Sequence, residues 1–311
     1  MEISITQVAQ GIFKVGPLKG GHMAPATSPY LVIGSKQAAV IEPGEDGQVP
    51  GLMEAIKLCG VDLGRVAYVI PTHIHFHHIQ GVPLLLKELP KAKFVVHPLA
   101  APHVIEPTRL IQSTIEAWGD KCYGPFSAIT QNRVVAAEDG QVFDLGRNEL
   151  EIVYTPGHAP HHISILDRFT RAVWPGDLPS YGDPGHPRMG HDIRPPLFDL
   201  EKYLKSVQRL RDLKPSVFLT FHDWGVDFSP EETLTWNEEL HNALARICRE
   251  GMKQKASFKE ILRRAEEWQS AREAMPVGES GLAGGLFGLI AFLHRQDPSL
   301  EMPAGATPLM R

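Results

Sequence analysis

Four histidines in close succession follow a short apolar run of this 311-residue chain. The run covers residues 66–70, and the histidines are His73, His75, His77 and His78. Successive side chains of an extended segment point to opposite sides, so His73 and His75 share a side, and a turn into a helix would bring His77 or His78 back toward them. Imidazole suits zinc, iron, copper and nickel better than calcium or magnesium. The spacing therefore predicts a transition-metal site, and the alternative is a surface histidine cluster that holds no ligand.

Three later segments also place a metal-ligand residue type where an apolar run stops. They are His158 after the run 150–153, Asp177 after 173–174, and His222 after 217–221. Imidazole and carboxylate groups are both common ligands of transition metals. These segments favour a metal site over a histidine cluster without a ligand.

In this order the segments resemble the metallo-β-lactamase superfamily, over about residues 5–225. Its pattern is HxHxDH, a Gly-His, a Gly-Asp and a late His, and the matching residues are His73, His75, His78, His158, Asp177 and His222. The segment 40–44 resembles the family's strand that ends in Asp-x-Gly, with Glu42 in place of the Asp. The resemblance implies an α/β fold, an αββα sandwich of two mixed β-sheets flanked by helices, with metals at one edge.

The resemblance also implies a ligand set for two divalent transition-metal ions. It assigns His73, His75 and His158 to the first ion, assigns His78, His222 and residue 77 to the second, and puts Asp177 between them. Zinc is expected first, with iron or manganese as alternatives.

The main departure from the family pattern is His77, which stands where the family has Asp. A neutral imidazole removes one negative charge from the second site, so a bridging hydroxide should be favoured and its conjugate water should be more acidic. The opposite outcome is that the longer imidazole fails to reach the metal and leaves the second site weak. Because six potential ligands remain without His77, we expect a dinuclear site.

The resemblance implies hydrolysis of a carbonyl compound by a metal-bound hydroxide, with Asp177 and His77 in the catalytic site. The resemblance does not select the substrate, and we expect a small-molecule ester, lactone or thioester before a β-lactam. A first alternative, which the resemblance also implies, is a di-iron redox protein that handles oxygen or nitric oxide; the histidine-rich site is compatible with iron. A second alternative is a non-catalytic sensor that lost the second metal through the change at His77.

Other polar residues near these segments are candidates for supporting roles. His22 and Tyr181 lie in loops that could contact substrate, and Asp223 and His161 are next to candidate ligands in the sequence and could orient them.

Composition excludes several other classes of protein. The chain is 43% hydrophobic and 22% charged, has no apolar run long enough to span a membrane, and begins without a secretory signal pattern, so we expect a cytoplasmic protein. The net charge of -5 provides no basic surface for nucleic acid. The three cysteines, Cys59, Cys122 and Cys248, are widely spaced and predict no disulfide framework.

The remaining patterns predict the elements that hold the ligands. Strands are expected at 11–15, 30–33, 38–41, 66–70, from 93, and at 133–136, 141–144, 149–154, 162–166 and 217–221, with helices at 52–58, 82–89 and 200–213. Ser229 and Pro230 then begin a helical region, with further helices at 257–268 and 282–293. Ser257 and Glu260 have the spacing of a capping box at the start of the first of these helices. We therefore expect a catalytic domain at 1–228 and a helical extension at 229–311 that covers this domain or forms a homodimer contact.

Overall fold

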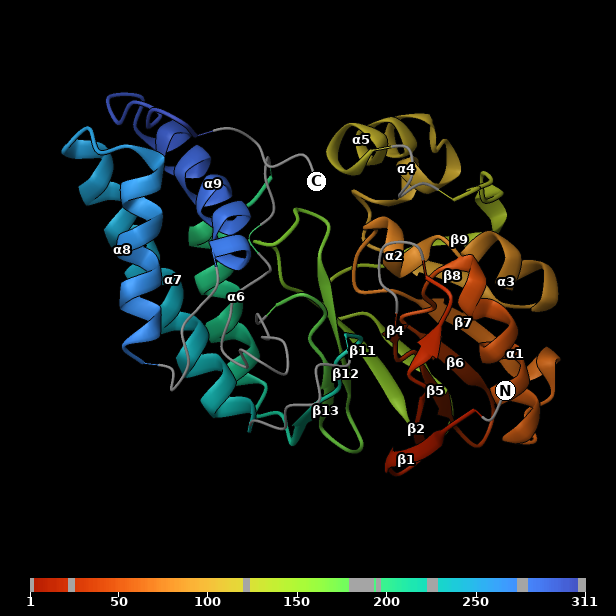
Figure 1. Cartoon of the computed structure of the whole chain (residues 1–311). Helices are drawn as coiled ribbons and strands as arrows, with labels where there is room; N and C mark the ends of the chain where they lie inside the picture. Colours follow the sequence, from red (N-terminus) through yellow and green to blue (C-terminus); the bar gives the residue numbers. More distant parts are fainter. Residues whose placement is uncertain are drawn as a thin grey trace.

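The computed structural model of this chain describes residues 3–21, 26–119, 124–178, 193, 197–222, 229–272 and 279–306. Within these residues two β-sheets lie face to face, and helices cover the outer face of each sheet (Figure 1). This arrangement confirms the predicted αββα sandwich.

The first sheet has seven strands in the order β1-β2-β5-β6-β7-β8-β9. They are β1 (Ile5–Ala9), β2 (Ile12–Val15), β5 (Tyr30–Ile33), β6 (Ala38–Ile41), β7 (Val66–Ile70), β8 (Lys93–Val96) and β9 (Val134–Ala136). The pairs from β1 to β6 are antiparallel, and those from β6 to β9 are parallel. Because β6 and β7 run in the same direction, with Ile41 opposite Ile70, the residues that follow both strands meet at one edge.

The second sheet has five strands in sequence order. They are β10 (Val142–Asp144), β11 (Glu149–Tyr154), β12 (Ile163–Asp167), β13 (Ala172–Trp174) and β14 (Val217–Phe218). Only the pair β13–β14 is parallel among these strands. A small hairpin, β3 (Leu18–Lys19) and β4 (Ala26–Thr27), lies outside both sheets.

Alternating side chains of the buried strands fill the space on both faces of each sheet. In β6, Val40 belongs to the apolar cluster beneath the helices, whereas Ile41 belongs to the cluster between the sheets. Ile165 of β12 faces the space between the sheets, and Leu166 packs on the opposite side. This two-sided burial explains why the strands read as nearly continuous apolar runs in the sequence.

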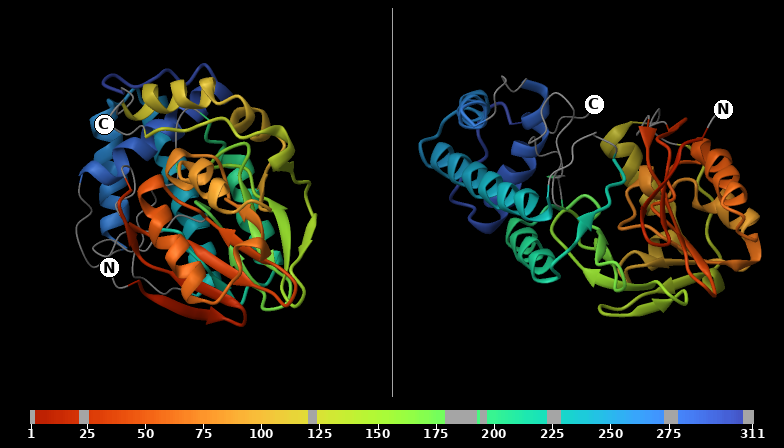
Figure 2. Two further views of the ribbon diagram at one scale, coloured as in Figure 1. Left: turned by 90° about the vertical axis from the view of Figure 1, so that its right-hand side faces the viewer. Right: turned by 90° about the horizontal axis from the view of Figure 1, so that it is seen from below.

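Helices form the outer layers of the sandwich. On the first sheet these are α1 (Val49–Leu58), α2 (Phe76–Ile79), α3 (Val82–Glu88), α4 (Ala101–Ile105) and α5 (Thr108–Trp118). The second sheet is followed by α6 (Leu200–Asp212), α7 (Pro230–Lys253), α8 (Phe258–Ser270) and α9 (Glu279–Gln296). Figure 2 shows that α7, α8 and α9 lie on the far side of the second sheet from the first.

The helical extension shares an apolar core with the second sheet. One cluster includes Val173 of β13, Leu210 of α6, Leu240 of α7 and Leu286 of α9. At the start of α7, Ser229 and Glu232 form a reciprocal capping box, which supports the predicted helix start. The division into domains at residue 228 stays a prediction.

Two predicted details differ from the structure. The strand expected at 217–221 ends at Phe218, and the carbonyl of Phe221 accepts a hydrogen bond from the Ser28 N–H, in the first half of the chain, and not from the second sheet. At Ser257 only the hydroxyl cap is present, since the Glu260 carboxylate pairs instead with Arg263 and Arg264.

The pattern analysis did not predict β1, the β3–β4 hairpin, α4 or α5.

Cys59 and Cys248 are free thiols, and Cys122 lies outside the described residues. Within the described part of the chain, no helix is both long and apolar enough to cross a membrane.

Candidate metal centre

The loop after β7 brings the first four histidines to the edge of the first sheet. The backbone at His75 is extended, with φ −62° and ψ 144°, and the single turn of α2 begins at the next residue. Ile74, Phe76 and Ile79 are buried in the apolar cluster beneath the helices. These apolar side chains alternate with the histidines and anchor the segment that carries them.

One group of donor atoms joins His73, His75, His158 and Asp177, whose candidate ligand atoms lie within 4.8 Å of one another. Nδ1 of His75 lies 2.8 Å from Nε2 of His73 and 3.0 Å from Nε2 of His158. Oδ2 of Asp177 lies 3.8 Å from Nε2 of His73 and 3.6 Å from Nε2 of His158. Ligand nitrogens of a tetrahedral zinc ion are about 3.4 Å apart, so these spacings suit one ion.

A second group joins His77, His78, Asp177 and His222, again within 4.8 Å. Oδ1 of Asp177 lies 3.4 Å from Nε2 of His78 and 3.5 Å from Nε2 of His222. Each carboxylate oxygen of Asp177 therefore faces one of the two groups. The imidazole of His77 reaches the second group, although it replaces the carboxylate of the family pattern.

Polar atoms without partners indicate what the second group can bind. Nδ1 of His77, Nε2 of His78 and Oδ1 of Asp177 are buried and have no hydrogen-bond partner among the described residues. Buried polar atoms are usually satisfied, so orphaned atoms that converge on one point need an explanation. A metal ion at the centre of the group would satisfy all three atoms.

The protonation states of the first group also fit metal binding. Burial lowers the pKa values of His73 and His75 well below the usual value, so both imidazoles are neutral at pH 7. Burial alone would raise the pKa of Asp177, but the positive charge of His78 holds it well below the usual value for a carboxyl group. Neutral imidazoles and an ionised carboxylate are the forms that bind a metal.

In the second group the pKa values of the histidines shift in opposite directions. Burial lowers the pKa of His77 well below its usual value. For His78 burial acts in the same direction, but the carboxylates of Glu42 and Asp177 outweigh it and raise the pKa to about 10. His78 thus lies where two negative charges stabilise a positive one, and a metal ion at Nε2 would supply that positive charge.

Glu42 is connected by hydrogen bonds to one histidine of each donor group, to His78 directly and to His73 through Thr72. This buried residue has a φ of 54°, its Oε1 accepts a 2.5 Å hydrogen bond from the Thr72 hydroxyl, and its Oε2 lies 2.9 Å from Nδ1 of His78. Because the Thr72 hydroxyl donates to Glu42, Nδ1 of His73, at 3.1 Å, donates to Thr72. Protons on Nδ1 of both imidazoles leave Nε2 of His73 and of His78 free to bind an ion.

His222 is held by residues of both halves of the chain. It follows β14 of the second sheet, but its backbone forms an antiparallel bridge with Thr27 of the hairpin. The hydroxyl of Tyr30 donates a 2.8 Å hydrogen bond to the carbonyl of Thr220. The second group is therefore complete only when the hairpin and the first sheet are in place.

Several predicted supporting residues are not tested by these contacts. His22, Tyr181 and Asp223 lie outside the described residues. The ring of His161 stacks at 6.4 Å on that of His73, but its buried Nδ1 has no hydrogen-bond partner in the part of the chain that the structure describes, so its orienting role stays a prediction. The adjacent His162 accepts a hydrogen bond from the Asp177 backbone.

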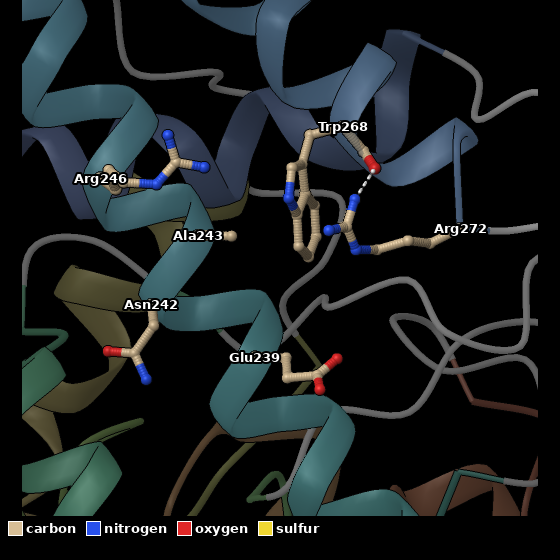
Figure 3. Close-up of a pocket in the computed structure, with 6 residues that line it drawn as sticks. All are labelled: Glu239, Asn242, Ala243, Arg246, Trp268 and Arg272. Carbon is tan, nitrogen blue, oxygen red and sulfur yellow. Dashed lines mark hydrogen bonds between the residues drawn. The ribbon is translucent and has the colours of Figure 1, made fainter.

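A pocket of about 390 Å³ lies apart from these groups, in the helical extension (Figure 3). Its lining residues are Glu239, Asn242, Ala243, Arg246, Trp268 and Arg272. The Arg272 guanidinium lies 4.1 Å from the Trp268 ring centre and also donates to the Trp268 carbonyl, so the protein itself covers part of the aromatic surface. None of the lining residues belongs to either donor group.

Comparison with known proteins agrees with the fold. The chain is 29% identical over 216 residues to the metallo-beta-lactamase fold-containing protein ST1585 of Sulfurisphaera tokodaii, across 65% of this chain and 77% of that protein. The crystal structure of ST1585 superposes with a TM-score of 0.59 at 26% identity and covers 74% of this chain and 86% of its own.

Two further proteins are more distant. Over 199 residues the chain is 24% identical to an atrochrysone carboxyl ACP thioesterase of Aspergillus fumigatus, across 64% of this chain but only 51% of the thioesterase. The structure of MEM-A1, a subclass B3 metallo-beta-lactamase from a soil metagenome, has a TM-score of 0.54 at 19% identity, with 74% of this chain and 89% of its own covered, and shows the shared fold alone.

The family model of the metallo-beta-lactamase superfamily matches residues 24–222. This range holds the strands from β4 to β14 and all seven residues of the two donor groups. The chain therefore belongs to the metallo-β-lactamase superfamily.

Proposed function

We propose that this chain is a metal-dependent hydrolase that acts on the carbonyl group of an ester, a lactone or a thioester. The observation that carries the proposal is the position of Asp177, whose two oxygens face different donor groups at 3.4–3.8 Å. Two divalent transition-metal ions, zinc in the first place, would polarise the carbonyl and activate water when bound between these groups.

The residues of the chain have separate roles in this proposal. His73, His75 and His158 would hold one ion, and the second would be held by His77, His78 and His222. Asp177 would bind both ions and keep them at a fixed separation. The second ion would then have three neutral imidazoles and a shared carboxylate, so the pair of ions would carry more positive charge than in the family pattern with Asp at position 77.

The substrate class rests on the relatives and on chemistry. Members of the superfamily are mostly hydrolases and usually bind two metal ions. The relatives include the thioesterase described above, and thioesters, esters and lactones present the same carbonyl to an attacking water. We propose that residues 1–228 hold the donor groups and that residues 229–311 cover α6 and support the second sheet.

Metal content and activity of one preparation would test the proposal. The protein would be purified without chelator or added metal, analysed by elemental mass spectrometry, and assayed against a panel of esters, lactones and thioesters. About two zinc ions per chain and hydrolysis of one class are expected. Asp177→Asn should lower both metal content and activity, whereas Asp139→Asn, which changes an exposed partner of Arg209, should alter neither.

Other results would contradict the hydrolase. Two iron ions per chain with oxygen or nitric oxide consumption and no hydrolysis would favour the redox alternative, because imidazole donors suit iron as well as zinc. A metal-loaded protein that binds a small molecule without turning it over would instead be a sensor.

A further inference from the structure

The turn that carries Asp177 is closed by a chain of hydrogen bonds through three buried side chains. The Asp177 N–H donates to Nε2 of His162 at 3.2 Å. Nδ1 of His162 lies 3.0 Å from Oγ1 of Thr155, which lies 2.8 Å from Oγ of Ser164. The Ser164 hydroxyl donates to the carbonyl of Pro175 at 3.3 Å. This series of hydrogen bonds thus begins at Asp177 and ends at Pro175, two residues apart on the same turn.

The direction of each hydrogen bond follows from the first. A backbone N–H can only donate, so Nε2 of His162 carries no proton, and the proton of the neutral imidazole must be on Nδ1. Nδ1 therefore donates to Thr155, whose hydroxyl is left to donate to Ser164, and Ser164 donates to Pro175. Every donor in this series of hydrogen bonds has an acceptor. A buried polar network makes its surroundings rigid when it is satisfied in this way.

Gly176 shows how closely His162 approaches the turn. It has a φ of 68°, and a Cβ added there would lie 2.4 Å from Nε2 of His162 and 2.6 Å from Oγ1 of Thr72. His162 and Thr72, the partner of Glu42, thus both pack against the side of Gly176 from which a side chain would project. This contact leaves little freedom for the backbone that carries the Asp177 carboxylate.

We propose that His162 is a positioning residue that, together with Thr155 and Ser164, orients Asp177 so that its two oxygens divide between the two donor groups. This inference rests on the proposed function, because it assumes that Asp177 binds both ions. Loss of the His162 acceptor would let the turn rotate, so that the carboxylate serves the two groups less well. We expect metal affinity to fall about 10- to 100-fold, as is typical when a partner behind a metal ligand is lost.

The test uses metal binding by the full-length protein instead of activity alone. Wild type and the variants His162→Phe, His162→Gln and Thr155→Val would be stripped with chelator and titrated with Co²⁺, whose visible spectrum reports the ligand geometry, and with Zn²⁺ against a competing chelator. His162→Phe keeps a ring without an acceptor, His162→Gln offers an acceptor oxygen at similar reach, and Thr155→Val removes the group that accepts from Nδ1. His241→Phe is the matched control, since His241 is equally buried in α7 and bonds within its own helix.

The expected result is weaker Co²⁺ and Zn²⁺ binding with an altered Co²⁺ spectrum in His162→Phe, partial recovery in His162→Gln, an intermediate loss in Thr155→Val, and no change in His241→Phe. Wild-type affinity and spectrum in folded His162→Phe would overturn the positioning role while leaving the hydrolase proposal intact. If His162→Phe does not fold, wild-type affinity in both His162→Gln and Thr155→Val would overturn it. Wild-type protein that binds fewer than two ions would instead contradict the proposed function.

Discussion

Oε2 of Glu42 lies 2.9 Å from Nδ1 of His78, although 36 positions separate the two residues in the sequence. The carboxylate follows β6 and the imidazole follows β7, and the parallel pairing of these strands brings the two together. Glu42 therefore determines which nitrogen of His78 faces the second donor group.

Replacing Glu42 by Gln should weaken the second ion selectively. The amide keeps the size of the side chain but removes the negative charge opposite His78, so we expect about a 10- to 100-fold loss of affinity for the second ion. The first ion should be less affected, because three other histidine nitrogens surround it. Stepwise Zn²⁺ titration against a chelator would separate the two ions, with Glu149→Gln, an exposed residue paired with Arg168, as control. Unchanged affinity for both ions would show that Glu42 does not orient His78.

The identity of residue 77 can be tested in two directions. His77→Ala should reduce the metal content toward one ion per chain, because the second group loses one of its donors. His77→Asp should keep two ions but change the rate or the preferred metal, since it adds a negative charge to the site. Elemental mass spectrometry and kinetics on the same preparations would measure both effects. If neither variant differs from wild type, His77 is not a ligand.

Removal of metal should destabilise the protein. Nδ1 of His75 lies 2.8 Å from Nε2 of His73, and a cation bound to both nitrogens would cross-link this part of the folded chain. Metal that binds only the folded state adds about 4 kcal/mol of stability at a thousandfold excess over its dissociation constant. Calorimetry with and without chelator should therefore show a lower Tm for the stripped protein, reversed by Zn²⁺. An unchanged Tm would contradict metal binding at this site.

Tyr30 should affect the site through the backbone before His222. Tyr30→Phe removes the hydrogen bond to the Thr220 carbonyl while keeping the ring against Trp174, so we expect a loss of about 1 kcal/mol of stability. Affinity for the second ion should also fall, because His222 is then held less firmly. Tyr154→Phe is a matched control, since it removes a hydroxyl bond to the Ala137 carbonyl away from His222. Equal metal affinity in the two variants would rule out this coupling.

The helical extension should be required for stability. Leu240 of α7 is completely buried in the cluster shared with the second sheet, so Leu240→Ala should cost about 2–5 kcal/mol. Leu58→Ala is the control, because that side chain is 62% exposed and its loss should have little effect. A chain ending at residue 228 should not fold stably, since it would expose the apolar face of α6. Urea unfolding of the three proteins would measure these effects, and a stable truncated chain would show two independent domains.

The positions of most strands and of the candidate ligands along the sequence could be predicted from local patterns. Apolar runs of four to six residues mark the buried strands such as β5, β6 and β11, and each candidate ligand follows a run in which the chain has reached the edge of its sheet. This works because hydrophobic patterning and turn residues act over a few positions, where the sequence carries the information directly. Glu42 could be noticed in the same way, but only as a departure from the family pattern.

Other features depend on contacts between segments far apart in the chain. The partners of Glu42, the hydrogen bond from Asp177 to His162 and the bridge between Thr27 and His222 follow from the pairing and facing of the strands. A periodic pattern shows which side chains are buried but not which distant segment lies beside them, because register and sheet order arise from the packing of the whole core. For the same physical reason, the sequence alone determined that ligand-type residues stand at strand ends. Only the tertiary structure decided that the imidazole of His77 reaches the second donor group and that the carboxylate of Asp177 faces both donor groups.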